Sequence, residues 1–257
     1  MKCSFFNREG VQALNPNVTL DATGAVHYLQ DAALAPGAFV AALLSHAHAA
    51  GLKIKSRIEI TDARRSGNHI QSLVAGGRHF ATDEFVIAGG VWTARLLTRM
   101  GIDLPMQSGK GYSLTLDNPP EMPSVCSILS EAHIALTPMG RSLRVAGTME
   151  VGTWDMKVRD GRVRGILRRR QRFFPKLEPK LFEGVTPWAG LRPVSPDGLP
   201  YIGRRHGTGN LTVATGHAMM GLSLAPVTRR LVGEILEGKQ PRPSAQALDA
   251  ARFSRRR

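Results

Sequence analysis

Cysteine is scarce in this sequence, and metal-ligand patterns are missing. The chain contains two cysteines, Cys3 and Cys126, which lie far apart and form no C-x-x-C pair. The histidines, His206 among them, show no metal-ligand spacing, and His46 and His48 point to opposite sides of an expected helix. These absences argue against a disulfide scaffold and a metal site, and they favour a reducing cytoplasm.

Long apolar runs are also missing. No stretch approaches the roughly 20 residues that a membrane span needs, and residues 1–8 lack the apolar stretch of a signal peptide. We therefore expect neither a membrane-spanning segment nor a signal peptide. What the chain does have is a globular composition, because 42% of its 257 residues are hydrophobic and 21% are charged. This balance excludes disorder, collagen and coiled coil, and the length fits one large domain or two modest ones.

Acidic residues are few relative to basic ones. The chain has 34 lysines and arginines against 20 acidic residues, which gives a net charge of +14. Residues 157–180 hold ten basic and two acidic residues, and residues 252–257 hold four arginines. A basic surface of this kind attracts polyanions, anionic lipid head groups or anionic substrates over long distances. Charge alone does not choose among these partners.

The first part of the chain alternates between helical and extended patterns. Apolar residues at helical spacing predict a helix that opens at residues 35–37 and ends at Gly51. Alternating residues then predict strands of an antiparallel meander, with turns at Asn68 and at Gly76-Gly77. The expected strands cover residues 52–55, 57–61, 70–74 and 78–80.

Two segments follow the order strand, glycine loop, helix. The first begins at residue 84 and passes through Gly89 and Gly90, and its continuous apolar strand should be buried on both faces, as in a parallel sheet. This pattern predicts a βα unit of a doubly wound domain. The second consists of a strand at residues 211–215, a loop at residues 216–221 and a helix. Pro226 is expected in the first turn of that helix, where its missing N–H is tolerated.

Residues 105–187 have a different texture. Their patterns predict antiparallel strands followed by an amphipathic helix with arginines on its outer side. The inner face of that helix should carry Val163, Ile166, Leu167, Arg170 and Phe174. We therefore expect an α/β fold in which residues 1–103 and 186–257 form a partial doubly wound domain. An antiparallel β-sheet domain, residues 104–185, is inserted into it.

Several spaced motifs occur in one order along the chain. They are V-I-A-G-G-V-W at 86–92, G-K-G-Y-S-L-T-L at 109–116, G-T-x-E at 147–150, W-A-G-L-R-P at 188–193 and T-G-H at 215–217. In these motifs the sequence resembles the FAD-dependent amino-acid oxidoreductases, of the D-amino-acid dehydrogenase and glycine oxidase type, over nearly its whole length. The resemblance implies that the doubly wound domain binds FAD and that the inserted domain binds the substrate.

One motif of that family is missing. Its members open with a strand, a G-x-G-x-x-G loop and a helix that hold the FAD pyrophosphate, whereas these 257 residues contain no G-x-G-x-x-G. The resemblance therefore implies an N-terminally truncated member. We expect the chain by itself to be colourless and inactive, and a partner chain that supplies the missing segment to restore both FAD binding and turnover.

Two residues are candidates for the substrate site. The planar fork of Arg192 can pair bidentately with a carboxylate, and family members use the arginine of this G-L-R-P motif for the substrate carboxylate. A salt bridge at the surface or between domains is the alternative for Arg192. Tyr112 is a candidate for the wall of the substrate pocket, and a core tyrosine with a hydrogen-bonded hydroxyl is the alternative.

Two glycine segments are candidates for the cofactor site. The resemblance places the loop after residue 215 near the flavin ring, where the N–H groups of a helix N-terminus stabilise negative charge. A plain strand-to-helix turn is the alternative, and His217 is expected to orient the backbone or to pack. Trp92 can also be a core tryptophan. The candidate cofactor-binding residues are Ala88, Gly89, Gly90, Trp92, Gly216, His217, Met219, Met220 and Gly221.

The expected activity is the oxidative deamination of a D-amino acid to a 2-oxo acid and ammonia, by hydride transfer to FAD. Dehydrogenases of the family pass electrons to a membrane quinone pool, so a cytoplasmic chain with peripheral contact to an anionic membrane surface is expected. The open alternatives are a non-catalytic remnant and one chain of a split flavoenzyme. A basic nucleic-acid-binding module is less favoured, because no aromatic residue interleaves with the arginines at 168–170.

Overall fold

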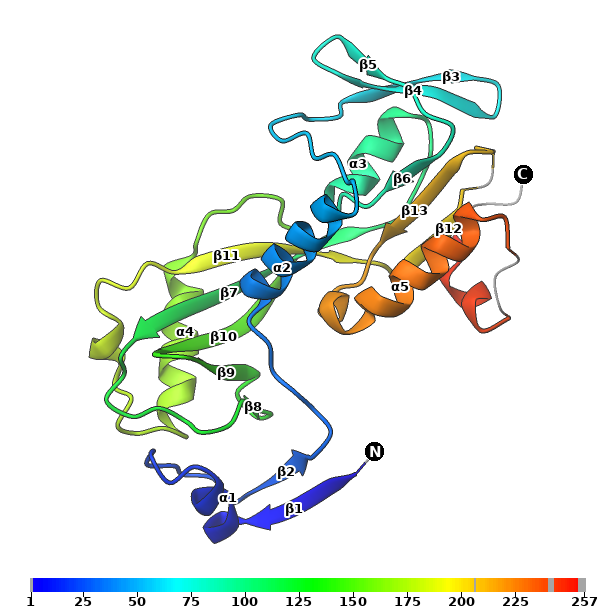
Figure 1. The fold of residues 1–257 in the computed structure, drawn as a ribbon. Helices are drawn as coiled ribbons and strands as arrows, with labels where there is room; N and C mark the ends of the chain where they lie inside the picture. Colours follow the sequence, from blue (N-terminus) through cyan, green and yellow to red (C-terminus); the bar gives the residue numbers. More distant parts are fainter. Residues whose placement is uncertain (1, 206, 240–242, 254–257) are drawn as a thin grey trace. The chain divides into compact units, whose positions relative to one another are not determined.

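The computed structural model describes residues 2–205, 207–239 and 243–253 (Figure 1). The chain forms two compact units. The first unit consists of Met1–Ala47, Lys110–Glu150 and Asp155–Gly190, and the second consists of His48–Gly109, Val151–Trp154 and Leu191–Arg257. The sequence-based division into residues 1–103 with 186–257 and residues 104–185 differs from these units mainly at the N-terminus. The structure groups the first 47 residues with the large antiparallel sheet.

A five-stranded sheet organises the first unit. Its order is β11-β7-β10-β9-β8. The strands are β7 (Gln107–Asp117), β8 (Ser127–Leu129), β9 (Ile134–Met139), β10 (Ser142–Val151) and β11 (Trp188–Val194). The β9–β10 hairpin turns at Gly140, where φ is +63°, and a glycine adopts this left-handed conformation without strain. The antiparallel sheet expected between residues 104 and 185 is therefore present.

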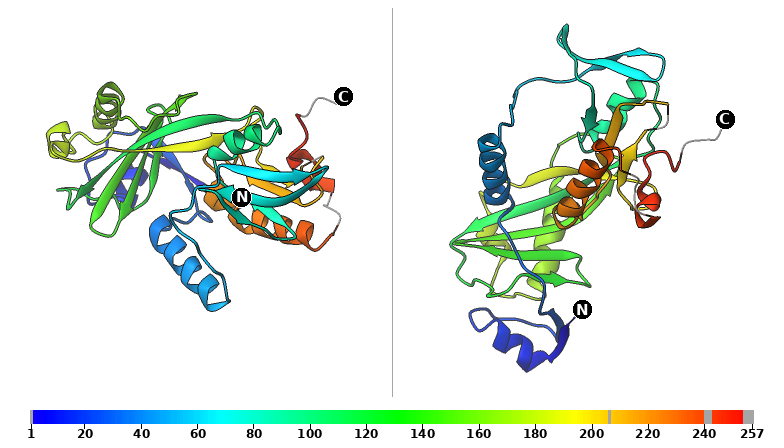
Figure 2. Two further views of the ribbon diagram at one scale, coloured as in Figure 1. Left: turned by 90° about the horizontal axis from the view of Figure 1, so that it is seen from above. Right: turned by 45° about the vertical axis from the view of Figure 1, so that its right-hand side comes forward.

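Helix α4 (Asp160–Gln171) covers one face of this sheet (Figures 1 and 2). Ile166 and Phe174 are buried in the core of the unit together with sheet residues such as Leu136, Leu143 and Val145. A short 3-10 helix, η1 (Pro179–Phe182), adds Phe182 to the same core. The inner face predicted from apolar spacing is confirmed, including the fully buried position of Arg170.

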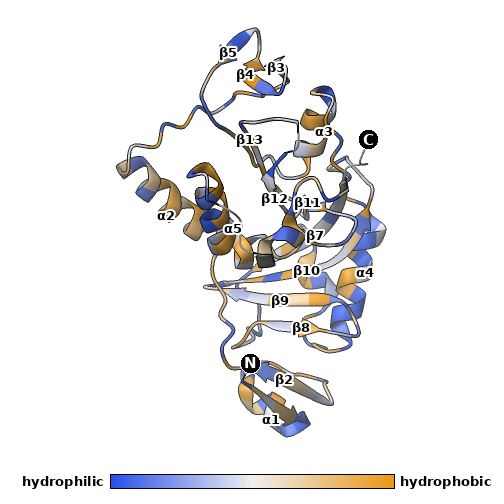
Figure 3. Cartoon of the chain, turned by 90° about the vertical axis from the view of Figure 1, so that its right-hand side faces the viewer, coloured by the Kyte–Doolittle hydropathy of each residue, from blue (hydrophilic) through white to orange (hydrophobic). Residues whose placement is uncertain are grey.

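The N-terminal part of the first unit is a small hairpin with two helices. Strands β1 (Cys3–Asn7) and β2 (Gly24–Tyr28) pair antiparallel, and the Asn7 side chain caps α1 (Arg8–Leu14) by accepting a hydrogen bond from the Gly10 N–H. Helix α2 (Pro36–Ala49) begins as the sequence predicts and is followed by Gly51 at φ +93°. None of the residues of α2, which is mostly apolar, is buried in the described chain (Figure 3).

An antiparallel meander opens the regular structure of the second unit. Strands β3 (Asp62–Ser66), β4 (His69–Ala75) and β5 (Arg78–Phe80) form it, and Gly76 and Gly77 make the predicted turn with positive φ at both residues. The strands expected at 52–55 and 57–61 are wrong, since neither segment is a strand. Alternation is not sufficient for a strand, which also needs a pairing partner and a face to bury.

A second sheet, β12-β13-β6, carries the helices of the second unit. Its strands are β6 (Phe85–Ile87), β12 (Tyr201–Arg204) and β13 (Leu211–Thr215), and its helices are α3 (Trp92–Arg99) and α5 (Gly221–Leu236). Strands β13 and β6 are parallel, as expected for a doubly wound arrangement. The burial expected on both faces of β6 is wrong at Val86, which is 40% exposed. Pro226 lies in the second turn of α5 rather than the first, because the helix begins directly at Gly221.

The remaining described element is η2 (Pro243–Leu248), which contacts β12. The α/β class predicted from the sequence is confirmed, with one antiparallel sheet and one sheet that contains a parallel pair flanked by helices. None of the described helices is both long and apolar enough to cross a membrane. Of the basic C-terminal residues, Arg252 is described, and the arginines at 255–257 lie outside the described residues.

Candidate functional site

The two glycine loops of the second unit lie at one edge of its sheet. Strand β6 runs into Ala88, Gly89 and Gly90, and the parallel strand β13 runs into the loop 216–221. The Thr215 hydroxyl donates a 2.8 Å hydrogen bond to the Gly90 carbonyl and so joins the loops. Ligands of open α/β sheets bind at the carboxyl ends of parallel strands, which is the position of both loops.

Both loops lead into helices, but the N–H groups of Trp92 and Thr93 at the start of α3 already donate to the Gly89 and Gly90 carbonyls, both at 3.2 Å. Val91 is the N-cap of α3 and Met220 is the N-cap of α5, and neither makes a side-chain capping hydrogen bond. Neither first turn contains an acidic residue. The first N–H groups of a helix have no partner within it, and they carry the positive end of the helix dipole. The start of α5 therefore offers donors to a group that bears negative charge.

Large apolar side chains are exposed in the same loops. Trp92 is 58% exposed and Met219 is 73% exposed, and Met220 and Leu222 are exposed as well. Ala88 is also exposed. The alternative of a core tryptophan at Trp92 does not describe this side chain. Exposed apolar groups beside uncapped helix N-termini suit a ligand with both a flat apolar part and an anionic part.

Backbone geometry explains two of the glycines. Gly216 has φ +84°, and a Cβ there would lie 3.1 Å from Cδ2 of Tyr201. Gly90 has φ +58°, but no heavy atom lies within 4 Å of its Cβ position. Gly216 is thus required by conformation and packing, whereas the space next to Gly90 is open to a bound group.

His217 is anchored to the helix that follows it. Its Nε2 lies 2.9 Å from the Thr228 hydroxyl on α5, and burial lowers the pKa of its imidazole, so the ring is neutral at pH 7. The Ala218 N–H donates a 2.9 Å hydrogen bond to the Pro193 carbonyl, and Val194 forms a bridge with His217. The contacts of His217 are those of a side chain that orients the loop, and they attach the loop to the end of β11.

Arg192 lies one residue before that attachment. Its side chain is half-buried, and burial lowers the pKa of its guanidinium. Arg192 makes no hydrogen bond or ion pair with any other residue that the structure describes. The salt bridge considered as the alternative is therefore not formed within the described chain. A partly desolvated guanidinium without a counter-charge is suited to bind a carboxylate through its two-pronged donor face.

Tyr112 lies in a cluster of charges in the first unit. The ring is 1% exposed, and its hydroxyl donates a 2.8 Å hydrogen bond to Oε2 of Glu150. This placement matches the core tyrosine that the sequence left open, and a role for Tyr112 in the substrate pocket stays a prediction.

Sequence reasoning missed the lysine beside it. Lys110 is fully buried, and its Nζ lies 3.1 Å from Oδ1 of Asp155 and 3.8 Å from Oε1 of Glu150. It also donates to the Lys157 carbonyl at 3.0 Å, while Arg159 pairs with Glu150 at 2.8 Å. The sequence did contain a sign of this cluster, because Lys110 is the charged residue of the G-K-G-Y motif and Glu150 is the charged residue of the G-T-x-E motif.

The arginines of residues 164–172, on α4 and at its C-cap, divide into two kinds. Arg164, Arg168, Arg169 and Arg172 are exposed and pair with no carboxylate in the described chain. Arg170 is fully buried over the Phe182 ring at 4.6 Å, and none of its guanidinium nitrogens has a hydrogen-bond partner among the described residues. Its burial lowers the pKa of the guanidinium to about 10. The outer row is a basic surface, and Arg170 is a buried cation that no ligand reaches.

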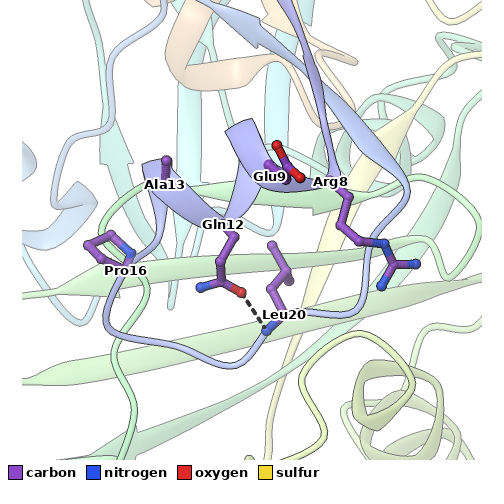
Figure 4. A pocket seen from close by; sticks show the side chains of 6 residues that line it. All are labelled: Arg8, Glu9, Gln12, Ala13, Pro16 and Leu20. Atoms are coloured by element: carbon purple, nitrogen blue, oxygen red, sulfur yellow. Dashed lines mark hydrogen bonds between the residues drawn. The ribbon is translucent and has the colours of Figure 1, made fainter.

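A shallow hollow of about 640 Å³ lies on the N-terminal hairpin (Figure 4). Its lining residues are Arg8, Glu9, Gln12, Ala13, Pro16 and Leu20. The Gln12 amide binds the carbonyls of Asn15 and Val18 and accepts from the Leu20 N–H. Gln12 therefore closes a loop, and none of the candidate residues lines this hollow. No three metal-binding side chains cluster in the described chain, and His206 lies outside the described residues.

Comparison with known proteins gives consistent matches. The family described as FAD dependent oxidoreductase matches residues 1–235. A D-amino-acid oxidase of Bradyrhizobium diazoefficiens is 33% identical over 219 residues, which are 85% of this chain and 52% of that protein. A D-amino acid dehydrogenase of Dechloromonas aromatica is 31% identical over 80% of this chain and 50% of that protein. The chain thus spans about half the length of these curated relatives.

A solved structure extends the likeness to the fold. The glycine oxidase of Geobacillus kaustophilus superimposes with a TM-score of 0.86 at 27% identity, covering 98% of this chain and 67% of that one. The resemblance expected from the five spaced motifs is therefore confirmed.

Proposed function

Because the chain belongs to the family of FAD-dependent oxidoreductases, we propose that it serves the oxidation of an amino acid bound by its carboxylate to Arg192. The finer proposal is the oxidative deamination of a D-amino acid to a 2-oxo acid and ammonia. The names of the relatives, D-amino-acid oxidase and D-amino acid dehydrogenase, support this substrate class. The observation that carries the proposal is the half-buried guanidinium of Arg192, which pairs with no residue in the part of the chain that the structure describes.

The residues of the two glycine loops fit the cofactor that the family uses. The uncapped N-terminus of α5 supplies N–H donors, and Trp92, Met219 and Met220 supply exposed apolar surface. Gly89, Gly90 and the loop 216–221 would hold FAD at this edge, with His217 fixing the loop against α5. FAD, when bound, supplies a hydride acceptor for the Cα–H bond of the substrate.

The chain's own residues bind and orient in this proposal. Arg192 neutralises the substrate carboxylate and fixes its direction. The open N–H groups at the start of α5 favour negative charge at the site. The substrate amine must be neutral when the hydride leaves, and water then hydrolyses the resulting imine to the 2-oxo acid and ammonia.

The proposal is tested by turnover in a reconstituted protein. Residues 1–257 are mixed with FAD and with the glycine-loop segment of the Dechloromonas aromatica dehydrogenase, and oxidation of D- and L-alanine is followed with an electron-accepting dye. We expect yellow colour, turnover of the D-isomer, and a loss of at least about 100-fold in kcat/KM for Arg192→Met. Equal turnover by Arg192→Met, or preference for the L-isomer, contradicts the proposal.

Residues 1–257 contain no G-x-G-x-x-G, the loop that binds the pyrophosphate in doubly wound dinucleotide-binding domains. The missing loop would otherwise supply several charge-assisted hydrogen bonds to the pyrophosphate, worth about 1.5–3 kcal/mol each. The chain by itself should therefore bind FAD too weakly to be yellow after purification. A stable yellow protein obtained from residues 1–257 alone contradicts this expectation.

The exposed arginines of α4 are proposed as the place where the chain contacts an anionic membrane surface. Four of the five arginines in residues 164–172 are exposed, and these four have no carboxylate partner in the described chain. Co-sedimentation with vesicles that contain anionic lipid should occur at low salt and decline with added salt. Failure to bind such vesicles at low salt, or equal binding to neutral vesicles, contradicts this partner.

A further inference from the structure

The loop between β13 and α5 holds one residue in a strained backbone conformation. Ala218 has φ +46°, which lies in the left-handed region that a residue with a Cβ adopts only at a cost in free energy. Gly216, two residues earlier, has φ +84°, which glycine adopts freely. A strained residue keeps its conformation only where the surrounding structure fixes it, so we expect contacts that hold this loop from outside.

Contacts with the end of β11 fix one side of the loop. The Ala218 N–H donates a 2.9 Å hydrogen bond to the Pro193 carbonyl, and His217 forms an antiparallel bridge with Val194. Pro193 directly follows Arg192 in the chain. The backbone that carries Arg192 is therefore attached to the strained residue, so a shift of the loop would also shift the base of this arginine side chain.

A side-chain hydrogen bond fixes the loop to α5. The Nε2 atom of His217 lies 2.9 Å from the Thr228 hydroxyl, and the His217 Cβ lies 3.8 Å from the Cβ position of Gly221, the first residue of the helix. The histidine side chain therefore lies along the first turns of α5. Pro226 lies inside the helix between these two contacts, and a proline there removes one backbone hydrogen bond. The contact between His217 and Thr228 bridges this weakened part of the helix.

The use that Thr228 makes of its hydroxyl differs from that of a second helical threonine. A threonine inside a helix loses side-chain freedom, and its hydroxyl commonly bonds the carbonyl one turn earlier. Thr98 on α3 does this, because its hydroxyl donates to the Ala94 carbonyl at 2.9 Å. The Thr228 hydroxyl is directed to His217, so it supports the loop and not the backbone of its own helix.

We propose that Thr228 is a positioning residue that, through His217, holds the loop 216–221 on the end of β11 and so keeps Arg192 in place for the substrate carboxylate. The inference rests on the proposed function, because it takes Arg192 as the carboxylate anchor. All of these residues belong to the second unit. Without the hydroxyl, Ala218 is free to relax to a negative φ, and its N–H leaves the Pro193 carbonyl.

The first measurement follows the loop without any ligand, by hydrogen exchange of the Ala218 amide in NMR. Thr228→Val removes the hydroxyl and keeps the β-branched shape, so exchange should become at least about tenfold faster. Thr228→Ser keeps a hydroxyl and should retain slow exchange. Thr98→Val is the matched control, because it removes a hydroxyl that bonds its own helix, and it should leave the exchange rate unchanged. Circular dichroism confirms that each variant is folded.

The second measurement follows the anchor, by calorimetry of D-alanine and of D-alaninamide, which lacks the carboxylate. The unmodified chain should bind D-alanine at least about tenfold more tightly than the amide, and Thr228→Val should reduce this ratio to at most about threefold. Thr228→Ser and Thr98→Val should keep the ratio of the unmodified chain. A threonine with only a structural role would change the free energy of unfolding without changing this ratio.

The outcomes separate the positioning role from the anchor. Unchanged exchange of the Ala218 amide in folded Thr228→Val overturns the inference, because the hydroxyl then does not hold the loop. Faster exchange with an unchanged ligand ratio also overturns it, since Arg192 then keeps its position without the loop. Thr228→Ser behaving like Thr228→Val overturns the hydrogen bond as the cause. Equal binding of the two ligands by the unmodified chain contradicts the proposed function itself, and the positioning role with it.

Discussion

Lys110 and Arg192 are both cations withdrawn from water, but their surroundings differ. Lys110 is fully buried and is met by Asp155, Glu150 and the Lys157 carbonyl. These partners raise the pKa of the Lys110 ammonium above its ordinary value, although desolvation, the largest influence on it, acts in the opposite direction. Arg192 is half-buried with no partner in the described chain, and desolvation lowers its pKa.

The difference distinguishes a cation that stabilises the fold, Lys110, from a cation that is available to bind a ligand, Arg192. A buried charge whose partners are all in place holds strands together, and its loss leaves those partners uncompensated. A desolvated charge that reaches solvent without a partner favours an anion from outside. Arg170 is the third case, because its buried guanidinium lies on the Phe182 ring and has no hydrogen-bond partner or carboxylate among the described residues, so we expect its charge to cost stability.

The largest effect is expected at Lys110. Lys110→Met should lower the free energy of unfolding by about 3 kcal/mol, because the Lys157 carbonyl loses its donor and Asp155 and Glu150 lose the buried ammonium, although Glu150 keeps Tyr112 and Arg159. Urea unfolding measures this loss. The control is Lys180→Met, which removes an exposed pair with Glu178 and should cost less than about 1 kcal/mol. A loss below that of the control contradicts the assignment of Lys110 as a structural cation.

Arg170 should respond in the opposite direction. Arg170→Met removes an unpaired buried charge and keeps an apolar chain against Phe182, so stability should rise by about 1–3 kcal/mol. Thermal or urea unfolding measures the change. The neighbouring exposed residue gives the matched variant, since Arg169→Met should change stability by no more than about 0.5 kcal/mol. Destabilisation by Arg170→Met would mean that the guanidinium has a partner.

The ion pair between Arg252 and Asp197 predicts that stability depends on pH. Arg252 donates two 2.8 Å hydrogen bonds to Asp197, and this contact lowers the pKa of the carboxyl to about 2. The pair's contribution, about 1 kcal/mol, is therefore present above the ordinary aspartate pKa near 4 and is lost as pH falls toward 2. Asp197→Asn should remove this part of the acid sensitivity, as unfolding measured between pH 5 and 2 will show. An unchanged pH profile contradicts the pairing.

The smallest stability effect is expected at Arg192. Arg192→Met breaks no pair in the described chain, so the free energy of unfolding should stay the same or rise by less than about 1 kcal/mol. Urea unfolding beside Lys110→Met measures the contrast. A loss similar to that of Lys110→Met would show that Arg192 is also a structural cation.

Local patterns predicted a large part of this fold. The inner face of α4, the Gly76-Gly77 turn and the parallel βα element at Gly89 followed from spacing and from glycine positions. The expected strands at 52–55 and 57–61 failed because alternation does not supply a pairing partner. The start of α5 was placed too late, since a proline in a second turn is not what local preference favours.

The sequence predicted the site residues that lie within one contiguous motif, because the residue type and its neighbours there indicate the chemistry without the fold. Arg192 and the loop 216–221 lie in contiguous motifs, whereas the partners of Lys110 lie 40 and 45 residues away in the sequence. Lys110 and Glu150 meet because β7 and β10 are neighbours in the sheet. No pattern along the chain reveals that register, and the hydrogen bond between His217 and Thr228 likewise needs the folded helix.

The most direct measurement is the affinity of D-alanine relative to D-alaninamide, determined by calorimetry for the unmodified chain and for Arg192→Met. The two ligands differ only in the carboxylate, and salt at about 0.15 M screens the long-range attraction of the basic chain. We predict that the unmodified chain binds D-alanine at least about tenfold more tightly than the amide, and that Arg192→Met binds the two alike. An equal preference for D-alanine in both proteins would contradict the assignment of Arg192 as the carboxylate anchor.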